Sequence, residues 1–174
     1  MPRKFLRRLA PPPQKLRSMR ALKPLGDWIY DPKLWHITRS STAMAFAVGL
    51  FCAMIPIPGQ VFVAAFFAVR LGANLPISVT LIWVTNPLTM PVIYYLAYKL
   101  GAFLLGTPLL PIEFTISWDW LTNSLGAIWA PFLLGCGVMG LICGLLGWLT
   151  VNTLWRLRVA RDWHKRRQRR SPTN

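Results

Sequence analysis

Two short polar interruptions stand in the most apolar part of the chain, and they contain the residues best suited to bind a ligand. Both combine proline, which breaks a helix, with side chains that donate hydrogen bonds. The predicted binding residues are Pro58, Gly59, Gln60, Thr85, Asn86, Pro87 and Thr89. If a half-helix follows each break, two helix N-termini with unpaired N–H groups lie beside these donors. Helix N-termini bind anions, so the pattern predicts a site for an anionic group.

Residues for hydrolytic catalysis or metal binding do not cluster in the sequence. Three of the five carboxylates lie in basic flanks, and Glu113 and Asp119 are expected in a solvated loop. The three cysteines have no CxxC spacing, and the two histidines are isolated. We therefore expect no catalytic residues, no metal and no cofactor, and a protein that is not an enzyme.

The composition is typical of a membrane-embedded protein with basic ends. Apolar residues make up 54% of the 174 residues and charged residues only 14%, against about 25% in soluble domains. Of the twenty Lys and Arg residues, ten lie in residues 1–39 and eight in residues 156–170. A net charge of +15 is compatible with nucleic acid, but basic flanks around an apolar centre favour cytoplasmic termini. We therefore expect contacts with anionic lipid headgroups and no nucleic-acid partner.

The lengths of the apolar segments predict how the first one folds. About sixteen residues separate Arg39 from Pro56, and ten separate Gly59 from Arg70. As helices these segments measure about 24 Å and 15 Å, whereas the hydrocarbon core of a bilayer is about 30 Å thick. Two full spans do not fit, so we predict a re-entrant hairpin that turns at PIPGQ. One long kinked helix is the alternative.

A direct repeat connects the two interruptions. A shift of 29 residues places Pro58 on Pro87 and the motif RLGA, from Arg70, on KLGA, from Lys99. Paired proline-broken segments are typical of midplane binding sites in transporters, although tight packing of a small bundle also explains such breaks. Because the second unit is expected to return like the first, we predict that Arg39, Arg70 and Lys99 are helix-end anchors at one membrane face.

These segments predict an all-α integral membrane protein. It is a small helical bundle with two proline-broken, re-entrant hairpins in a direct repeat, plus a glycine-rich transmembrane helix at residues 125–155. Gly140 and Gly144 form a GxxxG motif, which permits close packing within the chain or between two copies in a homo-oligomer. The predicted parts are a basic cytoplasmic tail (1–30), a membrane domain (31–155) with repeat units at about 44–73 and 74–102, and a basic cytoplasmic tail (156–174). A helix is expected to begin at Pro32, and the role of residues 100–124 stays open.

Three stretches carry a resemblance to a known family: AVGLFCAMIPIPGQ, LGANLPIS and WVTNPLTMPVIYYLAYKLG. They resemble the bacterial inner-membrane family DUF2062 over roughly residues 30–155. The resemblance implies a multi-pass protein of the bacterial inner membrane, and it implies no particular chemistry. The motifs also resemble, as a distant echo, the DedA-type membrane proteins, which have re-entrant loops and are linked to polyprenyl-phosphate recycling. Gln60 and Asn86 stand where DedA-type proteins carry ionisable residues, so a proton-coupled mechanism does not transfer.

Two functions follow as hypotheses. The first is a small transporter or lipid-phosphate-handling protein that holds an anionic headgroup between the breaks at the membrane midplane. In this hypothesis the Asn86 amide donates to the phosphate while its oxygen caps the next half-helix. The alternative is a non-transporting membrane anchor, or partner, of cell-envelope biosynthesis enzymes. Water-accessible turns favour the first hypothesis, and dry, fully packed turns favour the second.

Overall fold

The structure, a computed structural model, describes residues 32–108 and 125–170, and every regular element within these ranges is a helix. In chain order the elements are η2 (Pro32–Trp35), α3 (Arg39–Met54), α4 (Gln60–Arg70), α5 (Leu75–Leu81), η3 (Ile82–Val84), α6 (Met90–Leu105) and α7 (Leu125–Arg170). The short elements η2 and η3 are 3-10 turns. The predicted all-α class is therefore confirmed for this part of the chain. Glu113, Asp119 and the N-terminal tail lie outside the described residues.

Helix α3 begins later than expected. Pro32 opens only the 3-10 turn η2, and the helix starts at Arg39. The reason is a capping box between Thr38 and Ser41, in which each hydroxyl accepts the other residue's backbone N–H at 3.1 Å. This exchange satisfies two donors that a helix start otherwise leaves unpaired.

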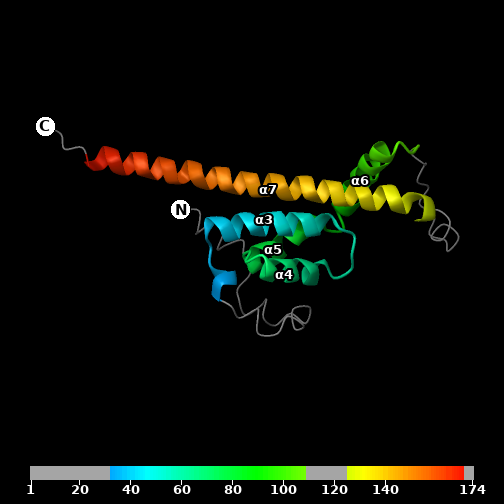
Figure 1. The fold of residues 1–174 in the computed structure, drawn as a ribbon, viewed down its shortest axis with the longest axis horizontal. Helices are drawn as coiled ribbons and strands as arrows, with labels where there is room; N and C mark the ends of the chain where they lie inside the picture. Colours follow the sequence, from blue (N-terminus) through cyan, green and yellow to red (C-terminus); the bar gives the residue numbers. More distant parts are fainter. Residues whose placement is uncertain (1–31, 109–124, 171–174) are drawn as a thin grey trace.

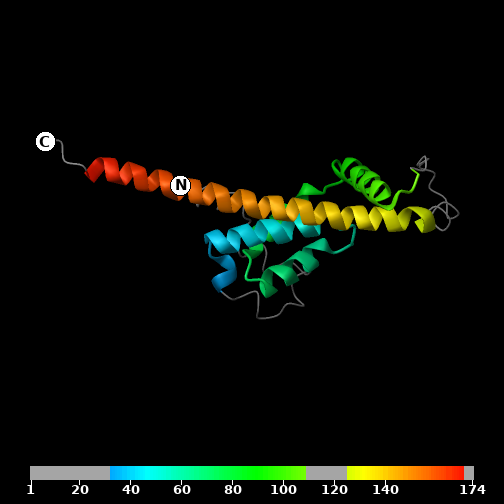
Figure 2. The same cartoon turned by 45° about the horizontal axis from the view of Figure 1, so that its top comes forward.

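Helix α7 is the long element on which α3 and α6 pack (Figure 1). Helix α3 lies antiparallel to its middle, α4 and α5 pack on α3, and α6 packs on the N-terminal part of α7. Figure 2 shows the same division, with α6 beside one half of α7 and α3, α4 and α5 beside the other. Helices α3 and α6 therefore follow one another along α7, and the two breaks lie between them.

The first repeat unit folds back on itself, whereas the second does not. Helix α4 starts after Gly59, whose φ of +88° lies in the left-handed region that favours glycine. It returns against α3, so PIPGQ is a turn between two packed helices. Helix α6 was expected to return along α5, but it packs on α7 instead. The second unit is thus an open, bent segment and not a closed hairpin.

Backbone contact between α6 and α7 explains this difference. A Cβ atom added to Gly101 would lie 1.7 Å from the carbonyl oxygen of Pro131, and one added to Gly135 would lie 1.8 Å from that of Ala97. Only two glycines allow the two backbones to approach so closely. The apolar face of α6 therefore has its partner on α7.

The glycine stripe further along α7 contacts α3 of the same chain. A Cβ atom on Gly144 would lie 2.8 Å from the carbonyl oxygen of Ala47, and one on Gly147 would lie 2.6 Å from Cδ1 of Leu50. Gly140 faces Phe51 in the same way. Of the two packing partners that the GxxxG motif left open, the structure has the one within the chain.

Large apolar side chains lie mostly outside this bundle, and small ones lie inside. The buried alanines are Ala43, Ala45, Ala53, Ala64, Ala65, Ala68, Ala73, Ala97 and Ala102. Exposed fractions reach 82% for Phe103, 69% for Trp83 and 86% for Leu88. The buried core also contains Leu75, Ile77 and Val79, but so many exposed large apolar side chains are unusual in water-soluble proteins, whose interiors hold most of such residues.

Among the described residues, α7 contains one segment long and apolar enough to cross a membrane, Ile128–Arg161. The whole helix has 46 residues, which corresponds to about 69 Å. It continues without interruption from the predicted spanning segment into the basic segment at residues 156–170. Within those residues the predicted C-terminal tail is helical.

The glycine contacts generate the first prediction. Gly101→Ala and Gly135→Ala should each lower the midpoint of thermal unfolding of the purified protein by about 5 °C or more. The reason is that the added methyl group would clash with backbone atoms of the facing helix, which cannot move away as a side chain can. Gly137→Ala is the matched control on the same helix. Nothing lies within 4 Å of a Cβ atom there, so this variant should unfold at the wild-type temperature or slightly above it. Equal midpoints for all three variants would contradict the backbone contact.

Candidate functional site

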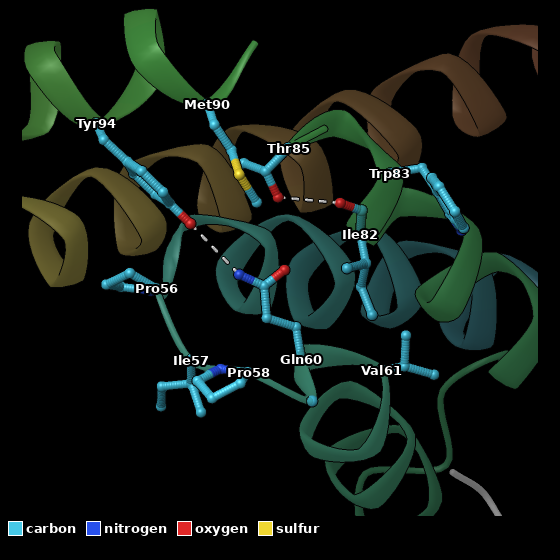
Figure 3. A pocket seen from close by; sticks show the side chains of 11 residues that line it. Pro56, Ile57, Pro58, Gln60, Val61, Ile82, Trp83, Thr85, Met90 and Tyr94 are labelled. Carbon is cyan, nitrogen blue, oxygen red and sulfur yellow. Dashed lines mark hydrogen bonds between the residues drawn. The ribbon is translucent and has the colours of Figure 1, made fainter. Parts of the chain in front are cut away.

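The two breaks meet at one pocket of about 480 Å³ (Figure 3). Its lining residues are Pro56, Ile57, Pro58, Gly59, Gln60, Val61, Ile82, Trp83, Thr85, Met90 and Tyr94. The pocket thus brings together the start of α4, the end of η3 and the first turns of α6. Of the seven predicted binding residues, four line it: Pro58, Gly59, Gln60 and Thr85. Asn86, Pro87 and Thr89 do not.

Gln60 joins the first break to α6. It is the first residue of α4, and its Nε2 donates to the carbonyl oxygen of Ile55, the residue that caps the C-terminus of α3. The same nitrogen lies 3.5 Å from the hydroxyl oxygen of Tyr94. Figure 3 shows the Gln60 amide and the Tyr94 hydroxyl directed toward each other. The predicted polar residue therefore faces the pocket, and it also has a structural task.

Thr85, which belongs to the second break, also donates a hydrogen bond to the end of α3. Its buried hydroxyl donates to the carbonyl oxygen of Ala53, in the last turn of α3, at 2.9 Å. The last carbonyls of a helix have no partner within the helix, and at a buried site each needs a donor. Thr85 and Gln60 supply donors at the end of α3. The second break is thereby tied to the end of the first helix.

Asn86 and Thr89 build the turn that leads into α6. The Asn86 side-chain oxygen accepts the backbone N–H groups of Leu88 at 2.9 Å and Thr89 at 3.1 Å. The Thr89 hydroxyl accepts the Asn86 N–H at 3.0 Å and donates to the Val84 carbonyl at 2.7 Å. This reciprocal pairing has the form of a capping box, with Pro87 at the first position of the turn.

The Asn86 oxygen was expected to cap the second half-helix, but it caps the turn that precedes this helix. The N-cap of α6 is Thr89, which makes no side-chain cap hydrogen bond, and the Asn86 carbonyl accepts the Met90 N–H at 2.8 Å. The Asn86 side-chain nitrogen, expected to face a phosphate, donates to the Trp83 carbonyl at 3.3 Å. The regular part of α6 starts at Met90, three residues after Pro87, with Pro91 in its first turn.

Tyr94 is a pocket residue that sequence reasoning missed. It lies one turn into α6, and its ring packs edge-to-face against Phe132 of α7 with centroids 5.5 Å apart. In the sequence it stands in an apolar run that also contains Tyr95. The available signal was chemical: a tyrosine in an apolar helix needs a partner for its hydroxyl.

The pocket lining contains no charged side chain. Of the predicted anchors, Arg39 is the first residue of α3 and Arg70 is the last residue of α4, where a cation complements the helix dipole. Lys99 was expected at a helix end but lies inside α6. In the described part of the chain, no three His, Cys, Asp or Glu side chains come together as metal ligands.

Arg70 and Lys99 have equivalent surroundings on their own helices. The Arg70 guanidinium lies 5.3 Å from the ring centroid of Phe66, and the Lys99 ammonium lies 5.6 Å from that of Tyr95. Each aromatic residue precedes its cation by one helical turn, so the rings lie within cation–π distance. Both pairs follow the 29-residue shift of the repeat. The two repeat units therefore share this cation–π contact as well as their sequence motif.

The capping turn generates the second prediction. Asn86→Ala removes the acceptor of two backbone N–H groups and should destabilise the fold by about 1–2 kcal/mol. Less protein should then accumulate in cells, as measured by quantitative immunoblotting. Leu88→Ala is the control in the same turn, because that side chain is 86% exposed and makes no side-chain hydrogen bond. Wild-type accumulation and melting of Asn86→Ala would show that the turn does not depend on this cap.

Comparison with known proteins gives one match. A family model described as "Uncharacterized protein conserved in bacteria (DUF2062)" matches residues 22–164. No curated protein and no solved structure matches the chain significantly. The matched range includes both breaks, the pocket and the glycine contacts along α7, and it covers more than the stretches that carry the resemblance in the sequence. The chain therefore belongs to the DUF2062 family of bacterial proteins.

Proposed function

We propose that this chain is an integral membrane protein that holds an amphiphilic lipid between its two helix breaks. The surface supports a lipid environment, because large apolar side chains are exposed along α4, α6 and α7 while alanine and glycine fill the contacts between helices. In lipid, exposing leucine and phenylalanine side chains carries no free-energy penalty, and small residues let helices pack closely. In water, the same surface would be a large aggregation-prone patch.

The order of contacts along α7 supports a specific topology. From Gly147 to Gly140 the partner is α3, and at Gly135 it is α6. Each partner helix has 16 residues, about 24 Å, which is too short for a core of about 30 Å. We therefore assign α3 and α4 to a re-entrant hairpin, α5, η3 and α6 to one broken crossing, and α7 to the return crossing. Two crossings place both basic ends on one side, the cytoplasm in a bacterial inner membrane.

The pocket between the breaks is the observation that carries the function. In this topology it lies near mid-depth, where exposed irregular backbone is tolerated only beside protein, water or a ligand. Its walls are largely apolar, and its polar side chains are those of Gln60, Thr85 and Tyr94. An apolar wall with a few polar groups suits the chain and the head of a lipid. Lipid handling, by binding or by transport, is the function that this geometry favours.

One observation favours the alternative function of a membrane anchor. Helix α7 projects beyond α3, α4 and α5 at its C-terminal end (Figure 1). This end contains residues 156–170, with eight Lys and Arg residues. A basic helix that leaves the membrane suits an acidic partner or an anionic surface. In that case the protein would anchor a cell-envelope enzyme and the pocket would stay empty.

The topology generates the third prediction. In a variant without native cysteines, Leu71→Cys should react with a membrane-impermeant maleimide from the cytoplasmic side, where both termini lie. Thr107→Cys, which follows α6, should react from the opposite side. Both positions are exposed, so their reactivity reports sidedness and not burial. Reaction of both cysteines from the cytoplasmic side would favour two closed hairpins and contradict the broken crossing.

The pocket generates the fourth prediction. Ile57→Trp adds bulk to the pocket wall and should reduce lipid that copurifies with the protein about tenfold, measured by native mass spectrometry. Leu88→Trp is the control, because Leu88 is exposed on the neighbouring turn and does not line the pocket. Both variants should melt like the wild type. Equal lipid content in both variants would favour the anchor function.

A further inference from the structure

The polar end of the pocket offers one donor and one acceptor side by side. The Tyr94 oxygen accepts from Gln60 Nε2 at 3.5 Å, the long limit of a hydrogen bond. Among the described residues the Tyr94 hydroxyl donates no hydrogen bond, and the Gln60 side-chain oxygen accepts none. Both groups face the pocket in Figure 3. A ligand hydroxyl, which donates once and accepts from neighbours, complements this pair.

The surroundings of the pocket disfavour an anion. Arg70 lies at the far end of α4, ten residues and about 15 Å along the helix from Gln60, and Lys99 lies over the ring of Tyr95. Within the described residues, the positive partial charge at the pocket is that of the N-terminus of α4, which no side chain caps. A helix end supplies about half an elementary charge. That charge does not offset the desolvation of a full anion in an apolar site.

We infer that the lipid in this pocket has an uncharged hydroxyl head, as in a long-chain alcohol, with Tyr94 and Gln60 as its polar contacts. The inference rests on the proposed function, because it specifies the ligand of the same pocket. It replaces the anionic headgroup that the sequence pattern predicted. Tyr94 is then the residue that selects for the head, since its O–H donates to no other group in the described chain.

Two ligands with the same tail test the head directly. Purified full-length protein in detergent is titrated with oleyl alcohol and with oleyl phosphate, and bound ligand is quantified by native mass spectrometry. The alcohol should bind at least about tenfold more tightly than the phosphate. Equal or tighter binding of the phosphate overturns the uncharged head but leaves a lipid site in place. Binding of neither ligand overturns the inference together with the proposed lipid function.

Matched tyrosine variants test the assigned contact. Tyr94→Phe keeps the ring and removes the hydroxyl, so the alcohol should bind about fivefold more weakly. Tyr95→Phe is the control, because this neighbouring ring is exposed and outside the pocket lining. Met90→Lys places a cation in the pocket wall and should shift the preference toward the phosphate. An unchanged alcohol affinity in Tyr94→Phe overturns the role of Tyr94.

Discussion

The close contact between the backbones of α6 and α7 at Gly101 and Gly135 is the constraint on which the arrangement depends. Because α6 is held there, it does not fold back on α5, and the second repeat unit opens. The first turns of α6 then face the start of α4 across a space that no helix fills. Tyr94 reaches into that space from one side and Gln60 from the other. The pocket thus results from the contact between Gly101 and α7, which lies about two helical turns from Tyr94.

The polar residues of the two breaks form most of their hydrogen bonds with backbone groups at the helix ends. Thr85 and Gln60 donate to the last carbonyls of α3, and Asn86 and Thr89 cap the turn before α6. In an apolar medium an unpaired carbonyl or N–H is costly, so these contacts are the condition for having breaks at all. Only those side-chain polar atoms that are not hydrogen-bonded to the backbone remain available to a ligand.

Local chemistry made much of this fold predictable from the sequence. Proline marked both breaks, glycine spacing marked the packing face of α7, and the 29-residue shift paired Arg70 with Lys99. The direction of α6 was not predictable, because a repeat specifies similar segments and not the same partner for each. The partners depend on Gly101 meeting Pro131 and Gly135, a contact between distant residues. Tyr94 was missed for the same reason, since its neighbour Gln60 lies 34 residues away.

The positions of the helix ends have an electrostatic consequence for the whole pocket. Helices α3 and η3 end at the breaks where α4 and α6 begin, so two C-termini and two N-termini converge on one region. The partial charges of C-termini and N-termini are of opposite sign. Where an N-terminus and a C-terminus lie near each other, their fields oppose, and the net field falls off faster with distance than that of a single helix end. No charged side chain lines the pocket, so among the described residues its field acts mainly on groups that are in contact with its wall.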